Sequence, residues 1–234
     1  MVNAGLLLLA DSRLPAGGHA HSGGLEPAAT AEVVRDLAGL ADFLRGRLAT
    51  TGLVTAALAA AACAQALAGG TGWAALDAEA DARTPSPAQR QASRAQGRSL
   101  LRAAGTAWPH PAFGALRAAL PAGPHHPVVL GVATAAAGGS PRDAAGIAAL
   151  GSVTGPASAA VRLLGLDPLA VHRLLASLSG LVDSVVDSVV DSVADEASVH
   201  AGEQGWALLP AASAPLLDLF AERHLVSELR LFES

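Results

Sequence analysis

Apolar side chains recur at three- and four-residue steps along much of this 234-residue chain. Between Val33 and Leu48 they keep this spacing while most charged residues fall elsewhere, which is typical of an amphipathic helix. Residues 53–68 are apolar nearly all round, as expected of a helix in the centre of a bundle. The sequence Thr-Thr-Gly at residues 50–52 is predicted to break the chain between these two helices.

Glycine and proline divide the rest of the chain into further short helices. Ser86, Ser140 and Asp167 each precede a proline, and an N-cap side chain followed by a first-turn proline predicts the start of a helix. No stretch gives alternating β-α-β units, so the expected fold is all-α, a single globular bundle of about ten short helices over residues 1–234. The further predicted helices cover residues 73–81, 87–105, 113–120, 128–137, 142–164, a segment that opens at 168, and 216–232.

A glycine-rich loop interrupts the periodic pattern near the N-terminus. Pro15 disfavours helical geometry in the residue before it, so a first helix is expected to end there. The glycine pairs at 17–18 and 23–24 suit positive φ angles or a close approach of the backbone. Ser22 is expected to cap a helix that opens directly after it. Residues 6–27 are therefore predicted to form a helix, a glycine-pinned loop and a second helix.

Two charged ridges follow from four-residue spacings. The basic ridge is formed by Arg90, Arg94, Arg98 and Arg102. The acidic ridge arises from the block Val-Asp-Ser-Val, which occurs three times, and is formed by Asp183, Asp187, Asp191 and Asp195. Residues four apart share a helix face, and like charges at that spacing destabilise an isolated helix, so we expect the acidic ridge to pair with arginines, with the basic ridge as one candidate. A solvated face, other internal acids, and docking of an acidic partner are the alternatives for the basic ridge.

Composition narrows the classes of function. The chain is 51% hydrophobic and only 3% aromatic, and much of the apolar content is alanine, which favours helices over a β-sandwich. The net charge of −5 argues against general binding of nucleic acid. The sequence contains no lysine, which excludes a Walker A phosphate loop and Schiff-base chemistry. Cys63 is the single cysteine, so an intramolecular disulfide and a cysteine-rich zinc site are excluded.

The N-terminus and the longest apolar run bear on location. No basic segment precedes the leucines at 6–9, so a secretory signal is not indicated. The apolar run at residues 53–70 is mostly alanine and contains Gln65, which favours a buried bundle helix over a membrane span. We therefore expect a cytoplasmic protein without membrane contact and without a cofactor.

Histidines are the main candidates for metal ligands. His19 and His21, two apart in the glycine loop, form a candidate divalent-metal site with Glu26, because imidazole and carboxylate both bind such ions. In the alternative interpretation both histidines simply bond to backbone or solvent. His125 and His126, in a proline-rich turn, are a further ligand candidate.

Catalytic motifs are otherwise missing from the sequence. It contains no G-x-S-x-G elbow and no H-E-x-x-H zinc motif. An alternative function remains in the loop at residues 11–26, a metal-dependent or nucleophilic hydrolase in which Asp11, Ser12 and a loop histidine would act together. The leading expectation is that the protein is not an enzyme.

The stretch Leu-Ala-Asp-Ser-Arg-Leu-Pro-Ala-Gly-Gly-His-Ala-His-Ser-Gly-Gly-Leu-Glu, residues 9–26, resembles the N-terminal signature of the UreF family of urease accessory proteins. Family members usually carry an aromatic or bulky apolar residue where His19 stands. Other family segments, a central helix with arginine and serine, a His-Pro-Val-Val-Leu-Gly stretch, an Ala-Val-Arg-Leu segment and the C-terminal tail, are similar to residues 90–102, 126–131, 158–167 and 222–234. The resemblance covers nearly the whole chain, although the Val-Asp-Ser-Val repeats are not a family feature.

The resemblance implies an all-α, non-enzymatic scaffold in urease maturation. UreF-like proteins bind the accessory protein UreD, also called UreH, and together they recruit the nickel-carrying GTPase UreG onto apo-urease. A homodimer within that complex and a surface that lines a nickel passage are also implied. Nucleotide chemistry then belongs to UreG, which agrees with the absence of lysine. Regulation of GTP hydrolysis by a ridge arginine is a further hypothesis.

The resemblance also indicates where partners bind. By position, residues 225–234 form a partner-binding tail, and the opening loop forms a second contact region. Arg230 and Phe232 are the leading tail candidates, because an arginine can fork onto a carboxylate and an aromatic ring can anchor an interface. The predicted partner-binding residues are Arg13, His21, Ser22, Glu26, Arg90, Arg94, Arg98, Arg230 and Phe232.

Overall fold

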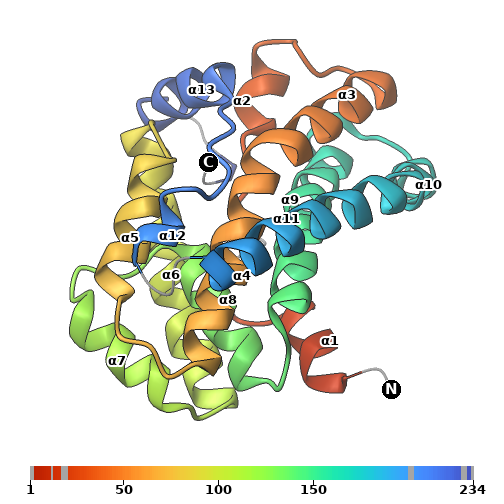
Figure 1. Cartoon of the computed structure of the whole chain (residues 1–234). Helices are drawn as coiled ribbons and strands as arrows, with labels where there is room; N and C mark the ends of the chain where they lie inside the picture. Colours follow the sequence, from red (N-terminus) through yellow and green to blue (C-terminus); the bar gives the residue numbers. More distant parts are fainter. Residues whose placement is uncertain (1–2, 12, 17–20, 200–202, 228–230, 233–234) are drawn as a thin grey trace.

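The fold is all-α, as predicted. The computed structural model describes residues 3–11, 13–16, 21–199, 203–227 and 231–232, and every regular element within those ranges is a helix. Figure 1 shows the helices arranged around a central one, with the last helix lying beside the second. Segments far apart in the sequence, α2 (Leu25–Thr30) and α13 (Pro215–Leu225), therefore lie side by side.

The centre of the bundle is α4 (Leu53–Leu67), which packs against α8 (His126–Ala136) and α9 (Pro141–Leu164). Most side chains of α4 and α8 are fully buried, and many of them are alanines that allow the helix axes to approach closely. Gly131 marks a close contact between α8 and α4, because a Cβ there would lie 2.2 Å from the carbonyl oxygen of Ala59. The alanine-rich runs thus form the core of the protein.

Two long helices cover this core. The first, α6 (Pro87–Ala107), packs on α8, and a Cβ on its Gly97 would lie 2.0 Å from the carbonyl oxygen of Pro124. The second, α11 (Ser179–Val199), crosses α9 and α4. The remaining helices are α1 (Ala4–Ala10), α2 (Leu25–Thr30), α5 (Trp73–Ala82), α7 (Pro111–Ala119), α10 (Pro168–Ser177), α12 (Glu203–Trp206) and α13 (Pro215–Leu225).

The predicted break at residues 50–52 is wrong. The helix α3 (Leu37–Arg47) continues through a π-helical turn, η2 (Leu48–Gly52), directly into α4. The Thr50 hydroxyl donates to the carbonyl oxygen of Gly46 at 2.8 Å, so the threonine side chain bonds within the helix instead of ending it. Gly52 has a helical φ of −64° and serves packing, because a Cβ there would lie 2.7 Å from Ser152 Oγ.

The three helix starts predicted from an N-cap residue before a proline are confirmed. Ser86 Oγ accepts a hydrogen bond from the backbone of the third residue of α6, and Pro87 occupies the first turn. Ser140 forms a capping box with Asp143 at the start of α9. Asp167 accepts from two backbone N–H groups at the start of α10. Short-range capping chemistry therefore fixed these boundaries.

The prediction that the acidic ridge pairs with an arginine is confirmed at Asp187, but the described residues show no pairing with the basic ridge. Buried Val186 and Val189 hold α11 against α9 and α4, so Asp183, Asp187 and Asp191 face solvent, and Asp187 pairs with Arg142 of α9. The basic ridge lies on α6, where Arg94 pairs with acids of α5 instead. The valines of the repeat, rather than its aspartates, decide which neighbour α11 packs against.

Two helical stretches, Leu37–Leu67 and Pro141–Leu164, are long and apolar enough to cross a membrane by length and composition. The bent pair α10 and α11 gives a third such stretch if it is counted as one. The most apolar 18-residue segment of each of the first two stretches is already partly covered within the protein, with 61% of it buried in Leu37–Leu67 and 56% in Pro141–Leu164. Their apolar surface is thus largely accounted for by packing in the core.

Candidate functional site

The opening loop leads into α2 through two glycines with left-handed backbone. Gly23 has φ 61° and Gly24 has φ 87°, a region that side chains with a Cβ rarely adopt. The helix therefore begins at Leu25, two residues later than predicted. Ser22 is fully buried, and its hydroxyl accepts from the backbone N–H of Glu26 at 3.2 Å. Ser22 thus stabilises the first turn without being the N-cap residue.

Glu26 fastens the C-terminal tail to this helix. Its carboxylate is buried, with the residue only 6% exposed. One carboxylate oxygen accepts from the backbone N–H of Leu231 at 2.8 Å, and the other accepts from the N–H of Phe232 at 2.9 Å. These bonds join positions more than 200 residues apart. No local sequence pattern indicates these bonds, because they link residues far apart in the chain.

The end of the tail is buried around Phe232. His224 Nε2 lies 3.1 Å from the carbonyl oxygen of Phe232 and 3.4 Å from a carboxylate oxygen of Glu26. The guanidinium of Arg162, on α9, lies 4.4 Å from the centre of the Phe232 ring, within the range of a cation–π contact. The amphipathic segment predicted at 216–232 is helical only as far as Leu225, and beyond it the backbone N–H groups of Leu231 and Phe232 bond to Glu26.

Beside this buried clamp lies an exposed apolar surface. Leu231 is 81% exposed and Val226 is 80% exposed, and Leu216, Leu219 and Leu225 of α13 are exposed as well. The tail therefore has two sides, an inner one that the chain itself covers and an outer one that faces solvent. The two regions predicted to contact partners, the opening loop and the tail, are brought together by these contacts (Figure 1).

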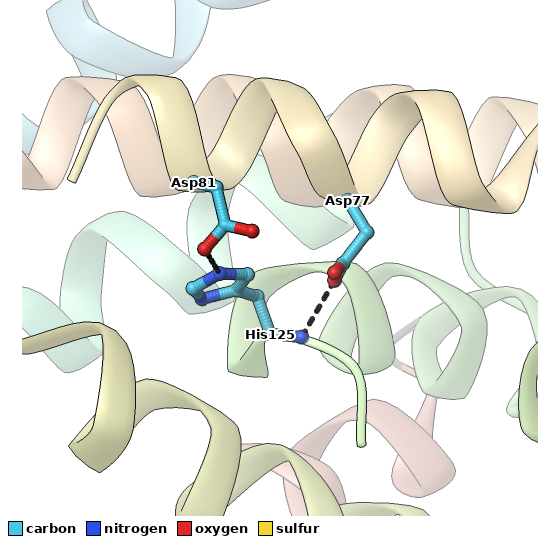
Figure 2. Close-up of side chains that lie close together, drawn as sticks. All are labelled: Asp77, Asp81 and His125. Carbon is cyan, nitrogen blue, oxygen red and sulfur yellow. Dashed lines mark hydrogen bonds and ion pairs between the residues drawn. The ribbon is translucent and has the colours of Figure 1, made fainter. Parts of the chain in front are cut away.

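A second cluster links α5 to the turn before α8. Asp77 and Asp81 lie four apart on one face of α5, and both point toward His125 (Figure 2). The backbone N–H of His125 donates to Asp77 at 2.8 Å, and His125 Nε2 lies 2.9 Å from Asp81. With the proton on Nε2, the other ring nitrogen accepts from the Ser93 hydroxyl at 2.9 Å. The spacing of the two aspartates was the sequence signal for this cluster, and the prediction missed it.

Arg94 closes this cluster. Its two terminal nitrogens donate to Asp77 at 2.8 Å and to Asp81 at 2.7 Å, on the oxygens that His125 leaves open. Partial burial acts to raise the pKa of Asp81, but His125 and Arg94 outweigh it and hold that pKa below its usual value. Ligand atoms of Asp77, Asp81 and His125 lie within 4.8 Å of one another. All four carboxylate oxygens already have partners, however, so the guanidinium takes the place that a cation would need.

The metal site predicted from His19, His21 and Glu26 is not supported. The Glu26 carboxylate is buried beneath the tail and engaged by two backbone N–H groups. His19 lies outside the described residues. His21 lies close enough to His126 that its charge helps to lower the pKa of His126 to about 4, an effect due chiefly to burial. The Glu26 carboxylate is therefore bonded to the tail and is not available to the loop as a metal ligand.

The alternative hydrolase at residues 11–26 is not supported either. Asp11 pairs with Arg13, whose guanidinium is the main reason that the pKa of Asp11 falls to about 2. Ser12 lies outside the described residues. Arg13 is exposed. Binding a partner through Arg13 would break its ion pair with Asp11, and exposed ion pairs contribute little to stability.

The remaining predicted partner residues divide by where their side chains go. Arg90 and Arg94 bond to groups within the chain, the carbonyl oxygens of residues 84 and 85 for Arg90 and the α5 aspartates for Arg94. Arg98 faces solvent. Arg230 lies outside the described residues. Whether any of these side chains contacts a partner stays a prediction.

Comparison with known proteins identifies the class. The model of the UreF family matches residues 34–179. A urease accessory protein UreF of Mycolicibacterium vanbaalenii is 45% identical over 99% of this chain and 98% of its own. One of Mycobacterium sp. strain JLS is 45% identical over 98% of this chain and 97% of its own, and one of Mycobacterium tuberculosis is 42% identical over 94% and 92%.

The protein is thus a urease accessory protein, a non-catalytic maturation factor and not an enzyme. More particularly, the chain belongs to the UreF family, as its opening sequence indicated.

Proposed function

We propose that this protein is a helical scaffold that, together with UreD, recruits the GTPase UreG to apo-urease for assembly of the nickel centre. It acts in the cytoplasm and as a homodimer within that complex. The observation that carries the proposal is the tail, which is fastened from inside by Glu26 while it presents Leu231 and Val226 to solvent. A fixed backbone with exposed apolar side chains is suited to binding another protein.

Pre-organisation is the physical advantage of this arrangement. Ordering a loose tail on binding costs conformational entropy, and the Glu26 hydrogen bonds meet part of that cost beforehand. The apolar residues beside it, Leu216, Leu219 and Leu225 of α13, extend the exposed surface over a helix. Phe232 supports this surface from within, and its predicted role as a direct contact is secondary in this proposal.

Co-purification with a UreD-like protein tests the proposal. The variants Val226→Glu and Leu231→Glu place a charge on exposed positions, so the fold is retained while an apolar interface would be disrupted. We expect both to lose the partner. The matched control is Leu169→Glu on α10, which is equally exposed at 79% but lies outside the tail. If both tail variants still form the full complex, the tail is not part of the interface.

Removal of residues 225–234 is a second form of the same test. We expect loss of the partner, but this deletion also uncovers the buried carboxylate of Glu26. Circular dichroism must therefore show that the shortened chain is folded. A folded, shortened chain that still assembles the complex contradicts the assignment of the tail.

A further inference from the structure

Three arginines surround a hollow on the side of the molecule formed by α6, α7 and the turn that follows α7. Arg98 and Arg102 come from α6, one helical turn apart, and Arg117 comes from α7. The hollow has a volume of about 340 Å³, and its other lining residues are mainly apolar: Leu101, Leu120, Pro121 and Pro124. All three arginines are exposed at its rim.

These guanidinium groups form no ion pair with a carboxylate among the described residues. In the described part of the chain Arg98 donates to the carbonyl oxygen of Ala122 at 3.2 Å, and Arg117 donates to that of Leu101 at 3.3 Å. Arg102 donates only weakly, to Ser99 Oγ at 3.4 Å. Most other arginines there, such as Arg94, pair with a carboxylate instead. A guanidinium has five N–H donors, so most of the donors at this rim remain open.

Two glycines leave room for the arginine side chains. A Cβ on Gly123, whose φ is +102°, would lie 2.6 Å from Arg98 Cγ, so the stem of that arginine lies against the bare backbone. A Cβ on Gly105 would lie 2.9 Å from an Nη atom of Arg117. The missing side chains leave the space that the arginine side chains occupy. The stem of Arg98 thus packs against the backbone at Gly123, which reduces the rotamer entropy that this side chain loses on binding.

We propose that this hollow is a docking site for an acidic segment of a partner protein, with carboxylates on the three arginines and an apolar side chain on the floor. Arginine forks onto carboxylates with two parallel hydrogen bonds, and clusters of arginines recognise acidic motifs in this way. A small inorganic anion uses the rim but gains nothing from the floor of Leu101, Leu120 and Pro121. The site is basic on a chain of net charge −5, so the attraction is local.

A labelled peptide of repeated Leu-Glu-Glu tests the site by fluorescence anisotropy with the full chain. We expect binding at low salt that weakens as salt screens the charges. The double variant Arg102→Gln and Arg117→Gln is expected to bind at least about fivefold more weakly, because it removes charge-assisted hydrogen bonds. The control Arg35→Gln, an exposed arginine paired with Glu32, is expected to bind as the unaltered chain does.

Competitors decide between possible occupants. A peptide with glutamine in place of glutamate is expected not to compete. Inorganic phosphate that displaces the peptide at equal concentration would overturn the proposal in favour of a small-anion site. If the chain binds anionic phospholipid vesicles and the double variant does not, the proposal is overturned in favour of a site for a lipid surface. Equal peptide binding by the double variant, or no binding at all, would also overturn it. None of these measurements depends on the proposed role in urease maturation.

Discussion

At the scale of single residues, Glu26 joins the two ends of the chain. Its two carboxylate oxygens each accept one backbone N–H of the tail, so replacing it by Gln leaves one of those N–H groups facing an amide NH₂. We expect Glu26→Gln to lower the free energy of unfolding by about 1 to 3 kcal/mol. Denaturant titration measures this loss, and hydrogen exchange at the amide of Phe232 is expected to accelerate.

Glu32→Gln is the matched control for that change. Glu32 is exposed and forms a surface ion pair with Arg35, and such pairs contribute about 1 kcal/mol or less. An equal effect of the two substitutions would show that the tail is not held by the buried carboxylate.

His126 provides a residue-scale prediction about pH. Burial, aided by the charge of His21, lowers its pKa from 6.5 to about 4 in the folded chain. The unfolded chain therefore takes up the proton first, and stability falls as the pH drops from about 6.5 to about 4, by up to about 1.4 kcal/mol per pH unit. In thermal melts across this range, His126→Gln is expected to flatten the slope, whereas His172→Gln, an exposed histidine, is expected to leave it unchanged.

Residues of this kind could be predicted from sequence only as candidates. The opening signature indicated that Ser22 and Glu26 matter, but not that Glu26 binds the tail, because a contact across 205 residues leaves no local pattern. Asp77 and Asp81 had a helical spacing that indicated a shared face. The third member, His125, is supplied by a distant turn, so the cluster itself could not be read along the chain.

At the scale of elements, Arg94 joins α6 to α5. Its guanidinium bridges Asp77, which is buried, and Asp81. Arg94→Met leaves the buried Asp77 without its counter-ion, and we expect a loss of about 2 to 4 kcal/mol in the free energy of unfolding. Arg98→Met, one turn further along the same helix, is the control, because Arg98 is exposed and bonds only to a carbonyl oxygen among the described residues. Similar losses from both would contradict the role of the cluster.

The π-helical turn η2 gives the second prediction at this scale. Gly52→Ala is expected to destabilise the protein by about 1 to 3 kcal/mol, because the added Cβ lies 2.7 Å from Ser152 Oγ where α9 packs. Gly46→Ala, in α3, meets nothing within 4 Å and is expected to stabilise the protein by about 0.5 to 1 kcal/mol. Thermal unfolding compares them, and a stabilised Gly52→Ala would mean that the contact with α9 is not tight.

Helix starts were predictable and helix continuity was not. The N-caps at Ser86, Ser140 and Asp167 depend on neighbours within three residues, so the sequence contains the whole interaction. The continuation of the helix through residues 50–52 depends on α9, which is about 100 residues away in the chain. The close approach of α9 requires a glycine inside the helix at position 52. Local breaking signals were outweighed there by tertiary packing.

At the scale of the whole molecule, the charged ridges show what composition and period cannot decide. The acidic and basic ridges have matching spacings, yet α11 and α6 lie against different parts of the core. Long-range packing of the valines and alanines determines where the two helices lie. The charged side chains then pair with whichever groups this packing brings near them. The family, in contrast, was evident from the opening sequence, because its motif extends over contiguous residues.

The nickel content of urease is the most direct test of the central claim, that this protein acts by holding other proteins through its tail surface. Urease is purified from cells that carry the unaltered chain, the double variant Val226→Glu and Leu231→Glu, or the control Leu169→Glu. The account predicts nickel-poor urease with the double variant and normal nickel with the control. Fully loaded urease from cells with the double variant would contradict it.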